Sequence, residues 1–327
     1  MEAKITQKIF SKFGELLDNG FGSDVVIEVG KEPYIEKFHV HSIVLMAVSP
    51  YFRAAFSSNW VNRFNGIIHF EKPNISPSIF RIILNFIYKA DLDLKQYKAS
   101  DICSLIKASD ELSIDVLNEH ILDFVTQNAS RLINEDPVQI LQIIFQLDIF
   151  SNLRNTFLQK ICDNPEKLVK FENFYTLDKY TLIQLLKRDD LNMDEVNIWC
   201  YLLNWACSNI QDKLDIKEVE KWESEDFTSL RDLLKDFIPH IRWFQISGKD
   251  FLYNVKPFKD VLPEELYDDL VGYNIDKSVK LKSLVILPQR NKNKIPVKVT
   301  HKYPTKTSKM SKKVPITMSK KGRAIVI

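Results

Sequence analysis

The sequence has 327 residues, of which 45% are hydrophobic and 27% charged, which is typical of a globular protein with two ordinary domains. No apolar run approaches the roughly 18 to 20 residues that cross a bilayer, so we expect no membrane partner. The formal net charge is +2, but residues 291–327 hold eleven basic and no acidic side chains, which leaves 34 basic and 43 acidic residues elsewhere. The mildly acidic body is not expected to bind nucleic acid, whereas the tail could contact a polyanion.

The first residues, Met1-Glu2-Ala3-Lys4, lack an apolar segment and a small-residue cleavage site. We therefore expect a cytoplasmic protein, with the nucleus as the alternative that the basic tail leaves open. Four cysteines have no CxxC spacing, and we expect buried thiols; they are Cys103, Cys162, Cys200 and Cys207. His39 and His41 share a strand face but lack two further ligands, so neither a metal nor another cofactor is expected.

The first 128 residues are expected to mix helices and strands. Apolar residues at helical spacing predict an amphipathic helix over 5–17, and Asn19-Gly20-Phe21-Gly22 ends it. The β-branched run Val25–Val29 and the extended run Tyr34–Val40 flank a turn and predict a hairpin. The other expected elements are helices over 42–48 and 50–56, a strand over 66–70, a helix capped by Ser76-Pro77, and a helical pair between Asp101 and Val125.

Strand signals almost vanish beyond Asn128, and the pattern becomes helical from the cap Asp136-Pro137 onward. One expected helix has a single apolar stripe and an opposite polar face; the stripe is Val196, Trp199, Leu203 and Ala206, and the outward residues are Asn197, Asn204 and Ser208. A last helix is expected within Phe258–Asn274, begun by Pro263. After Pro288 periodicity is lost, and the composition predicts disorder. We therefore divide the chain into domains 1–128 and 129–257, a connector 258–290 with one short helix, and a disordered basic tail 291–327.

No catalytic motif is present. The sequence contains no GxGxxG, P-loop, GxSxG or HExxH pattern, and no supported Cys-His pair. With eight glycines in the chain, phosphate-cradling loops and glycine-dense kelch blades are hard to accommodate. We therefore expect a protein that is not an enzyme.

Several segments resemble known families in order and spacing. Five segments resemble the BTB/POZ signature: Ser23-Asp24-Val25-Val26-Ile27, Phe38-His39-Val40-His41, Val44-Leu45, Ser49-Pro50-Tyr51-Phe52 and the helix Pro77–Tyr88. The BACK family is resembled by Leu185–Leu191, Glu195–Trp205 and Pro239–Phe244. Together these cover residues 20 to 257. The resemblance implies an α+β BTB/POZ domain followed by an all-α BACK domain.

A connector further along looks like that of a fungal-type BTB-BACK subgroup related to kelch-like proteins, in which a TLDc domain often follows. Its matching residues are Lys256-Pro257-Phe258 and Leu284–Pro288. Neither a kelch nor a TLDc domain is recognised here, and the basic tail stands in that place. A shortened paralogue, a truncated product and an error in the gene model all remain open.

The BTB resemblance implies a homodimer. The interface would contain Ile5, Ile9, Phe13, Leu16, Val44 and Leu45. A short amphipathic helix is marginal in water and needs a partner surface, which is either a second protomer or the helix's own domain. A two-fold dimer would make each client bivalent.

Relatives that recruit cullin-3 have a hydrophobic residue, any residue and then Glu after the helix that here holds Phe56. The aligned positions are Trp60, Val61 and Asn62. Trp60 is an apolar anchor of the kind that dominates interfaces, whereas Asn62 removes a charged hydrogen bond. The alternative is that Trp60 packs on its own loop.

Two positions depart from the family pattern. Ser42 stands where relatives have Lys or Arg, so the charged pocket that BTB repressors form with the acid matching Asp24 is not expected. Ala90 stands where Gly commonly ends the helix, and Lys89 or Asp91 is expected to adopt the left-handed turn.

The resemblance implies an adaptor that presents an unidentified client protein to a cullin-3 ubiquitin ligase, with the BACK helices as a spacer. One alternative is a self-associating scaffold without a ligase role. Another is a nuclear or nucleic-acid-associated protein that acts through the tail clusters Lys312-Lys313 and Lys320-Lys321-Gly322-Arg323. The tail itself either captures the client or is an inert extension.

Overall fold

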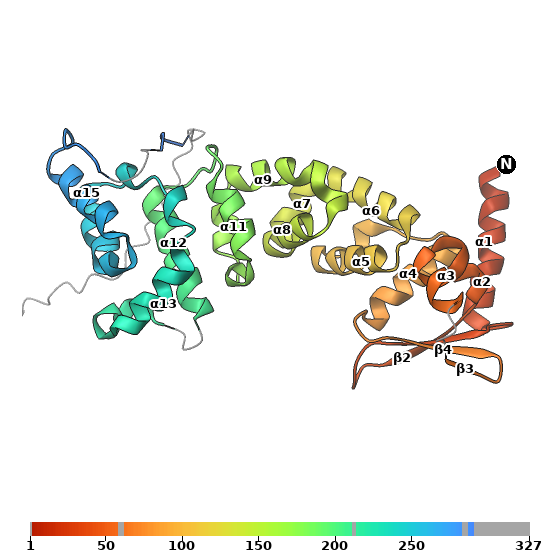
Figure 1. Cartoon of the computed structure of the whole chain (residues 1–327). Coiled ribbons are helices and arrows are strands. Elements are labelled where there is room, and N and C mark those ends of the chain that lie inside the picture. The colour runs from red at the N-terminus through yellow and green to blue at the C-terminus, as the bar shows by residue number, and fades with distance from the viewer. Residues whose placement is uncertain (1, 58–61, 211–213, 283–286, 291–327) are drawn as a thin grey trace, which may run out of the picture. The chain divides into compact units, whose positions relative to one another are not determined.

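The structure is a computed structural model that describes residues 2–57, 62–210, 214–282 and 287–290. A sheet and helices together form the first domain, and helices alone form the second (Figure 1). The predicted α+β domain followed by an all-α domain is therefore confirmed. The predicted disordered tail lies outside the described residues.

The first domain contains a four-stranded sheet in the order β2-β1-β4-β3. Its strands are β1 Val25–Val29, β2 Glu36–Val40, β3 Asn62–Phe64 and β4 Ile67–Lys72. Strand β1 pairs antiparallel with β2 and parallel with β4, so that Val25 lies opposite both Val40 and Ile68. The hairpin and the strand near 66–70 were predicted.

Strand β3 was missed. It pairs antiparallel with β4 through a tight turn in which Asn65 and Gly66 have φ of 50° and 83°. An Asn-Gly pair adopts such positive φ values readily, and two-residue hairpin turns require them. With only three residues, β3 is too short to show alternation in the sequence.

The described residues of this domain also form six α-helices: α1 Glu2–Asn19, α2 Ser42–Val48, α3 Pro50–Ser57, α4 Pro77–Lys89, α5 Ala99–Glu111 and α6 Asp115–Gln127. The predicted cap of α4 is present, because the Ser76 side chain accepts a hydrogen bond from the Ile79 amide. The expected left-handed residue after α4 was wrong. Ala90 itself adopts φ 48° and ψ 31°, since the helix ends at Lys89 and Ala has the smallest side chain that can occupy the turn without glycine.

The core of the first domain lies between the sheet and the helices. Val25, Ile27 and Val29 of β1 are fully buried, as expected for a strand covered on its inner face. Aromatic rings from α3 and β4 fill the space beside them, with Phe56 5.3 Å from Phe52 and 5.6 Å from Phe70 between ring centroids.

Helices and short 3-10 turns form the rest of the described chain, with no strand between residue 129 and residue 290 in its described parts. The α-helices are α7 Ala129–Glu135, α8 Pro137–Gln146, α9 Arg154–Asp163, α10 Glu166–Val169, α11 Lys179–Leu186, α12 Glu195–Asn209, α13 Ser224–Leu234, α14 Gly248–Asp250 and α15 Glu264–Ile275. Asp136 caps α8 through the Gln139 amide, as predicted. Within the described ranges, none of these helices is both long and apolar enough to span a bilayer.

Helix α12 is the centre of the second domain, and its burial differs from the prediction on both the apolar and the polar face. Trp199, Leu203 and Ala206 are fully buried as expected, but Asn197 is buried as well and Val196 is only half-buried. The prediction of an outward Asn197 was wrong because neighbouring helices cover α12 on more than one side, so a two-faced pattern does not describe it.

Candidate protein-interaction surface

Helix α1 packs on α4 along one side. An ion pair between Lys89 Nζ and Asp18 Oδ1, 2.8 Å apart, joins the ends of the two helices. Gly14 is buried against the Lys89 side chain, and a Cβ at this position would lie 2.9 Å from Lys89 Cγ. The glycine therefore allows α1 to approach α4 closely.

The opposite side of α1 carries a row of apolar side chains that the described residues leave about half exposed. Ile5, Ile9 and Phe13 are spaced four residues apart and are 54%, 52% and 40% exposed. Residues four apart lie on one face of a helix. Together with Leu16 and Phe21 they line a shallow depression. We call Ile5, Ile9, Phe13, Leu16 and Phe21 the α1 face.

Phe21 was not among the residues predicted for this surface. It lies in the turn after α1 and is 76% exposed. The flanking glycines, Gly20 and Gly22, have φ of 66° and 76°, a conformation that residues with a Cβ rarely adopt. The Phe21 amide donates to Asn19 Oδ1 at 2.8 Å. The glycine spacing in Asn19-Gly20-Phe21-Gly22 was the available signal that this ring is displayed by a tight turn.

A buried hydrogen-bond network fixes that turn to the core. His41 Nε2 lies 2.9 Å from the Phe21 carbonyl oxygen, and His41 Nδ1 lies 3.0 Å from the Tyr88 hydroxyl. A carbonyl only accepts, so Nε2 carries the proton and Nδ1 accepts from Tyr88. The same hydroxyl accepts from the His41 amide at 2.9 Å. Burial raises the pKa of Tyr88 to about 12, so the phenol keeps the proton that it donates.

Replacing Tyr88 with phenylalanine is expected to lower the free energy of unfolding by about 1 to 3 kcal/mol, because the buried His41 amide and Nδ1 lose their partner. Urea denaturation of the full chain measures this loss. Tyr180→Phe is the matched control, since the Tyr180 side chain is largely exposed, and it should leave stability unchanged. Equal stabilities of the two variants would show that the network contributes nothing.

The Asp24 carboxylate finds hydrogen-bond donors without a basic side chain. Its carboxylate accepts from the Ser42 amide at 2.7 Å and from the Ser42 hydroxyl at 2.5 Å, and it thereby binds the first amide of α2. Ser42 stands where relatives have Lys or Arg, so a helix-capping contact with Asp24 replaces the charge pair that a basic residue would form. Because Ser42 carries no charge, the Asp24–Ser42 contact forms no charged pocket of the kind expected for a repressor.

The structure separates the remaining predicted interface residues. Val44 is half-buried, but Leu45 is fully buried inside its own domain, because it packs on the core side of α2. The neighbouring Ile43 is 71% exposed and takes the surface position instead. Periodicity in the seven-residue helix α2 was too short to decide which of the three side chains faces outward.

Of the four predicted cullin-binding residues, two lie within the described residues and two do not. Phe56 is buried in the aromatic core, so it positions the segment after α3 rather than presenting its own ring. Trp60 and Val61 lie outside the described residues. Asn62 begins β3. The edge strand β3 and its exposed residue Phe64 follow that segment directly.

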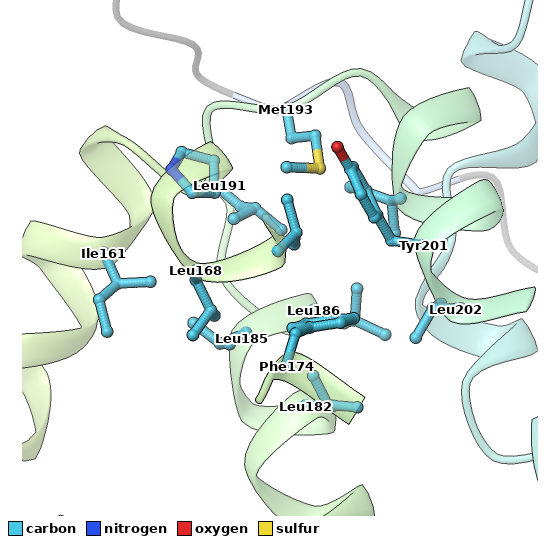
Figure 2. Close-up of a pocket in the computed structure, with 13 residues that line it drawn as sticks. Ile161, Leu168, Phe174, Leu182, Leu185, Leu186, Leu191, Met193, Tyr201 and Leu202 are labelled. Carbon is cyan, nitrogen blue, oxygen red and sulfur yellow. The ribbon is translucent and has the colours of Figure 1, made fainter. Parts of the chain in front are cut away.

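The second domain contains an apolar cavity of about 40 Å³ (Figure 2). Its lining comes from α9 to α12 and consists mainly of aliphatic side chains, including Leu168, Leu185, Leu191 and Met193. Tyr201 also lines it, and burial raises the pKa of this tyrosine to about 12. Apart from the Tyr201 phenol, none of its lining side chains carries a group that could act as an acid, a base or a nucleophile.

The cysteines also lack the environment of nucleophiles. All four are buried and form no disulfide. Burial raises the pKa values of Cys103, Cys162 and Cys207 to about 12, so these side chains remain thiols, whereas the thiolate is the reactive form. The described ranges hold no cluster of three His, Cys, Asp or Glu side chains that could bind a metal ion.

Comparison with known families agrees with this architecture. The family model of the BTB/POZ domain matches residues 13–129, and that of BACK, described as BTB And C-terminal Kelch, matches residues 139–219. The chain therefore carries a BTB/POZ domain followed by a BACK domain. The finer division at residues 128 and 257 stays a prediction.

Its curated relatives include Kelch-like proteins. Kelch-like protein 40 of Xenopus tropicalis is 28% identical over 194 residues, which are 59% of this chain and 29% of that protein. Human Kelch-like protein 28 is 25% identical over 212 residues, 64% of this chain and 33% of that protein. Trishanku of Dictyostelium discoideum is 24% identical over 221 residues, 64% and 30% of the two chains. The chain thus matches about a third of the length of these relatives.

Solved structures of BTB domains are also similar. The BTB domain of zebrafish PATZ1 matches with a TM-score of 0.31 and 26% identity, over 38% of this chain and 94% of that one. The BTB domain of human Gigaxonin matches with a TM-score of 0.30 and 20% identity, over 37% and 91%.

Proposed function

We propose that this protein is a non-catalytic, homodimeric adaptor that presents a client protein to a cullin-3 ubiquitin ligase in the cytoplasm. The observation that carries the proposal is the α1 face, an apolar surface on a BTB domain that the described parts of the chain leave largely exposed at Ile5, Ile9 and Phe21. Apolar surface of this kind marks a protein-binding site. A second copy of the chain is the partner that we propose for it.

The cullin component of the proposal rests on two supports. The relatives are Kelch-like BTB-BACK proteins, a group that includes cullin-3 adaptors. In addition, Trp60 follows α3 at the position of the hydrophobic anchor, between the buried Phe56 and the exposed edge strand β3. A tryptophan on such a segment is the residue type that most often dominates binding energy.

The Trp60→Ala variant is expected to bind the N-terminal domain of cullin-3 about 5- to 30-fold more weakly than the wild type, a loss of about 1 to 2 kcal/mol for a buried aromatic anchor. Isothermal titration calorimetry with purified full-length protein measures the change. Tyr180→Ala is the control, because Tyr180 is an exposed aromatic residue of the second domain. It should bind cullin-3 as the wild type does.

The Asn62→Glu variant is expected to change cullin-3 affinity in the opposite sense in the same titration. Restoring the carboxylate returns a charged hydrogen bond, so this variant should bind more tightly than the wild type. If neither the wild type nor Asn62→Glu binds cullin-3, the ligase role is excluded. Dimerisation without cullin binding would instead identify a self-associating scaffold, a role that Asn62 favours because it replaces the acid of the cullin-binding pattern.

The second domain is proposed to act as the spacer that holds the client-binding element. Its core on α12 is mainly apolar, with Trp199, Leu203 and Ala206 fully buried, and packed helices of this kind resist bending. The client itself is unidentified, and the basic residues after 290 are one candidate for its capture. Mass spectrometry of proteins crosslinked to the full chain, compared with a chain ending at Arg290, tests that role; nucleic acid recovered only with the full chain would indicate the nucleic-acid alternative.

A further inference from the structure

Residues 287–290 return to the second domain and bury a charged side chain there. The Arg290 side chain is 0% exposed, and its Nε lies 2.6 Å from Glu195 Oε1. Glu195 is itself only 4% exposed. A buried guanidinium and carboxylate require each other, because either one alone in the interior carries a large desolvation penalty.

The site supplies an acceptor for each of the five N–H donors of Arg290. Nη1 donates to the Leu186 carbonyl oxygen at 3.0 Å and to the Arg188 carbonyl oxygen. Nη2 donates to Glu195 Oε2 at 3.5 Å and to the His240 carbonyl oxygen at 3.4 Å. These acceptors come from the end of α11, the start of α12 and the 3-10 turn 238–240. An arginine side chain has five donors and no acceptor, so the arrangement of these acceptors is specific for arginine.

A second contact holds the same segment. Arg242 Nε donates to the Pro288 carbonyl oxygen at 2.6 Å, and Arg242 Nη2 is paired with Asp189. The Arg242 amide donates to Glu195 Oε2 at 3.1 Å. Residues 287–290 are therefore held by the Arg290 side chain and by their own backbone.

The charges in this cluster balance only when Arg290 is present. Two guanidinium groups, those of Arg242 and Arg290, face two carboxylates, those of Asp189 and Glu195. Arg242 Nη1 lies 3.9 Å from Glu195 Oε1 and has no hydrogen-bond partner. Without Arg290, the buried Glu195 would keep only this distant charge and the Arg242 amide. Arg242 therefore does not replace Arg290.

We infer that Arg290 is a latch that makes residues 287–290 a structural part of the BACK domain and fixes the point from which the chain continues. The matched BACK region ends at residue 219 and the predicted domain at residue 257, so both leave this segment out. The basic stretch 291–327 begins at the residue after Arg290. The latch thereby holds Arg290, the residue that precedes that stretch, beside α11 and α12. This inference does not depend on dimerisation or cullin binding.

Thermal unfolding of the full-length Arg290→Met variant tests the latch. Removing one partner of a buried ion pair is expected to lower the Tm of the second domain by about 10 °C or more. Arg81→Met is the matched control, because the Arg81–Glu36 pair is largely exposed, and its Tm should equal that of the wild type. A Tm for Arg290→Met equal to that of Arg81→Met would overturn the inference.

Hydrogen exchange separates a latch from a general loss of stability. Amides of residues 186–195 and 240–242 should exchange at least about tenfold faster in Arg290→Met, while those of β1 remain as in the wild type. Equal acceleration across both domains would contradict a local latch. If Arg290→Met is insoluble, the same hydrogen-exchange measurement is made on Arg290→Lys, because lysine keeps the charge but has three donors. Amide protection in Arg290→Lys equal to that of the wild type would contradict the arginine site.

A chain that ends at Arg290 provides the last comparison. It lacks the basic stretch but keeps every contact of the latch, so its Tm should match that of the full chain. A chain that ends at Ile286 lacks four further residues and should show the same loss as Arg290→Met. If both truncated chains unfold at the same temperature, residues 287–290 are not part of the domain.

Discussion

Replacing Trp199 with alanine is expected to lower the free energy of unfolding of the second domain by about 3 to 5 kcal/mol, the range for large buried aromatic residues. Trp199 lies on α12 and is fully buried. Its ring centroid is 5.0 Å from that of Trp243 and 6.4 Å from that of Phe258. The indole Nε1 also donates to the Asn254 carbonyl oxygen at 3.0 Å. The substitution therefore creates a cavity and leaves a buried acceptor unpaired.

Urea denaturation followed by circular dichroism measures this loss, with the second-domain transition fitted separately because the chain has two domains. Tyr253→Ala is the control, since Tyr253 is an aromatic residue of the same domain that is half exposed. It should change stability by less than about 0.5 kcal/mol. A loss below about 1 kcal/mol for Trp199→Ala would mean that α12 does not organise this domain.

The sequence predicted best those elements that depend on local interactions. The Ser76-Pro77 and Asp136-Pro137 pairs begin helices α4 and α8 because a side-chain acceptor and a fixed proline φ act within one turn. The burial of Trp199 followed from the density of apolar residues around it. By contrast, the parallel pairing of β1 with β4 joins residues more than forty positions apart, and no local pattern records it.

The candidate sites were predictable only in part. The stripe Ile5, Ile9 and Phe13 is periodic and was found, whereas Leu45 and Ile43 could be separated only by the packing of α2 on the core. Arg290 fell at the end of the predicted connector 258–290, and no local pattern marked it as buried. Its partner Glu195 is 95 positions away. Burial of such a pair depends on tertiary structure, which periodicity does not encode.

Introducing charge into the α1 face is expected to convert the proposed dimer into a monomer. In the double variant Ile9→Asp with Phe13→Asp, each side chain forfeits about 1.5 to 3 kcal/mol of apolar burial. A two-fold interface loses this twice, and the new carboxylates must also be desolvated. The dissociation constant should therefore rise by at least about 100-fold. Light scattering coupled to size-exclusion chromatography at micromolar concentration reads out the mass directly.

Folding should survive this change, because Ile9 and Phe13 are exposed in the protomer and α1 binds α4 through its other side. Ile275→Asp is the matched control: Ile275 is 83% exposed at the end of α15, so the same change of residue type there should leave the dimer intact. A variant that stays dimeric would place the interface elsewhere. A monomeric wild type would refute both the adaptor and the scaffold, since each requires a second copy to cover Ile5, Ile9, Phe13 and Phe21.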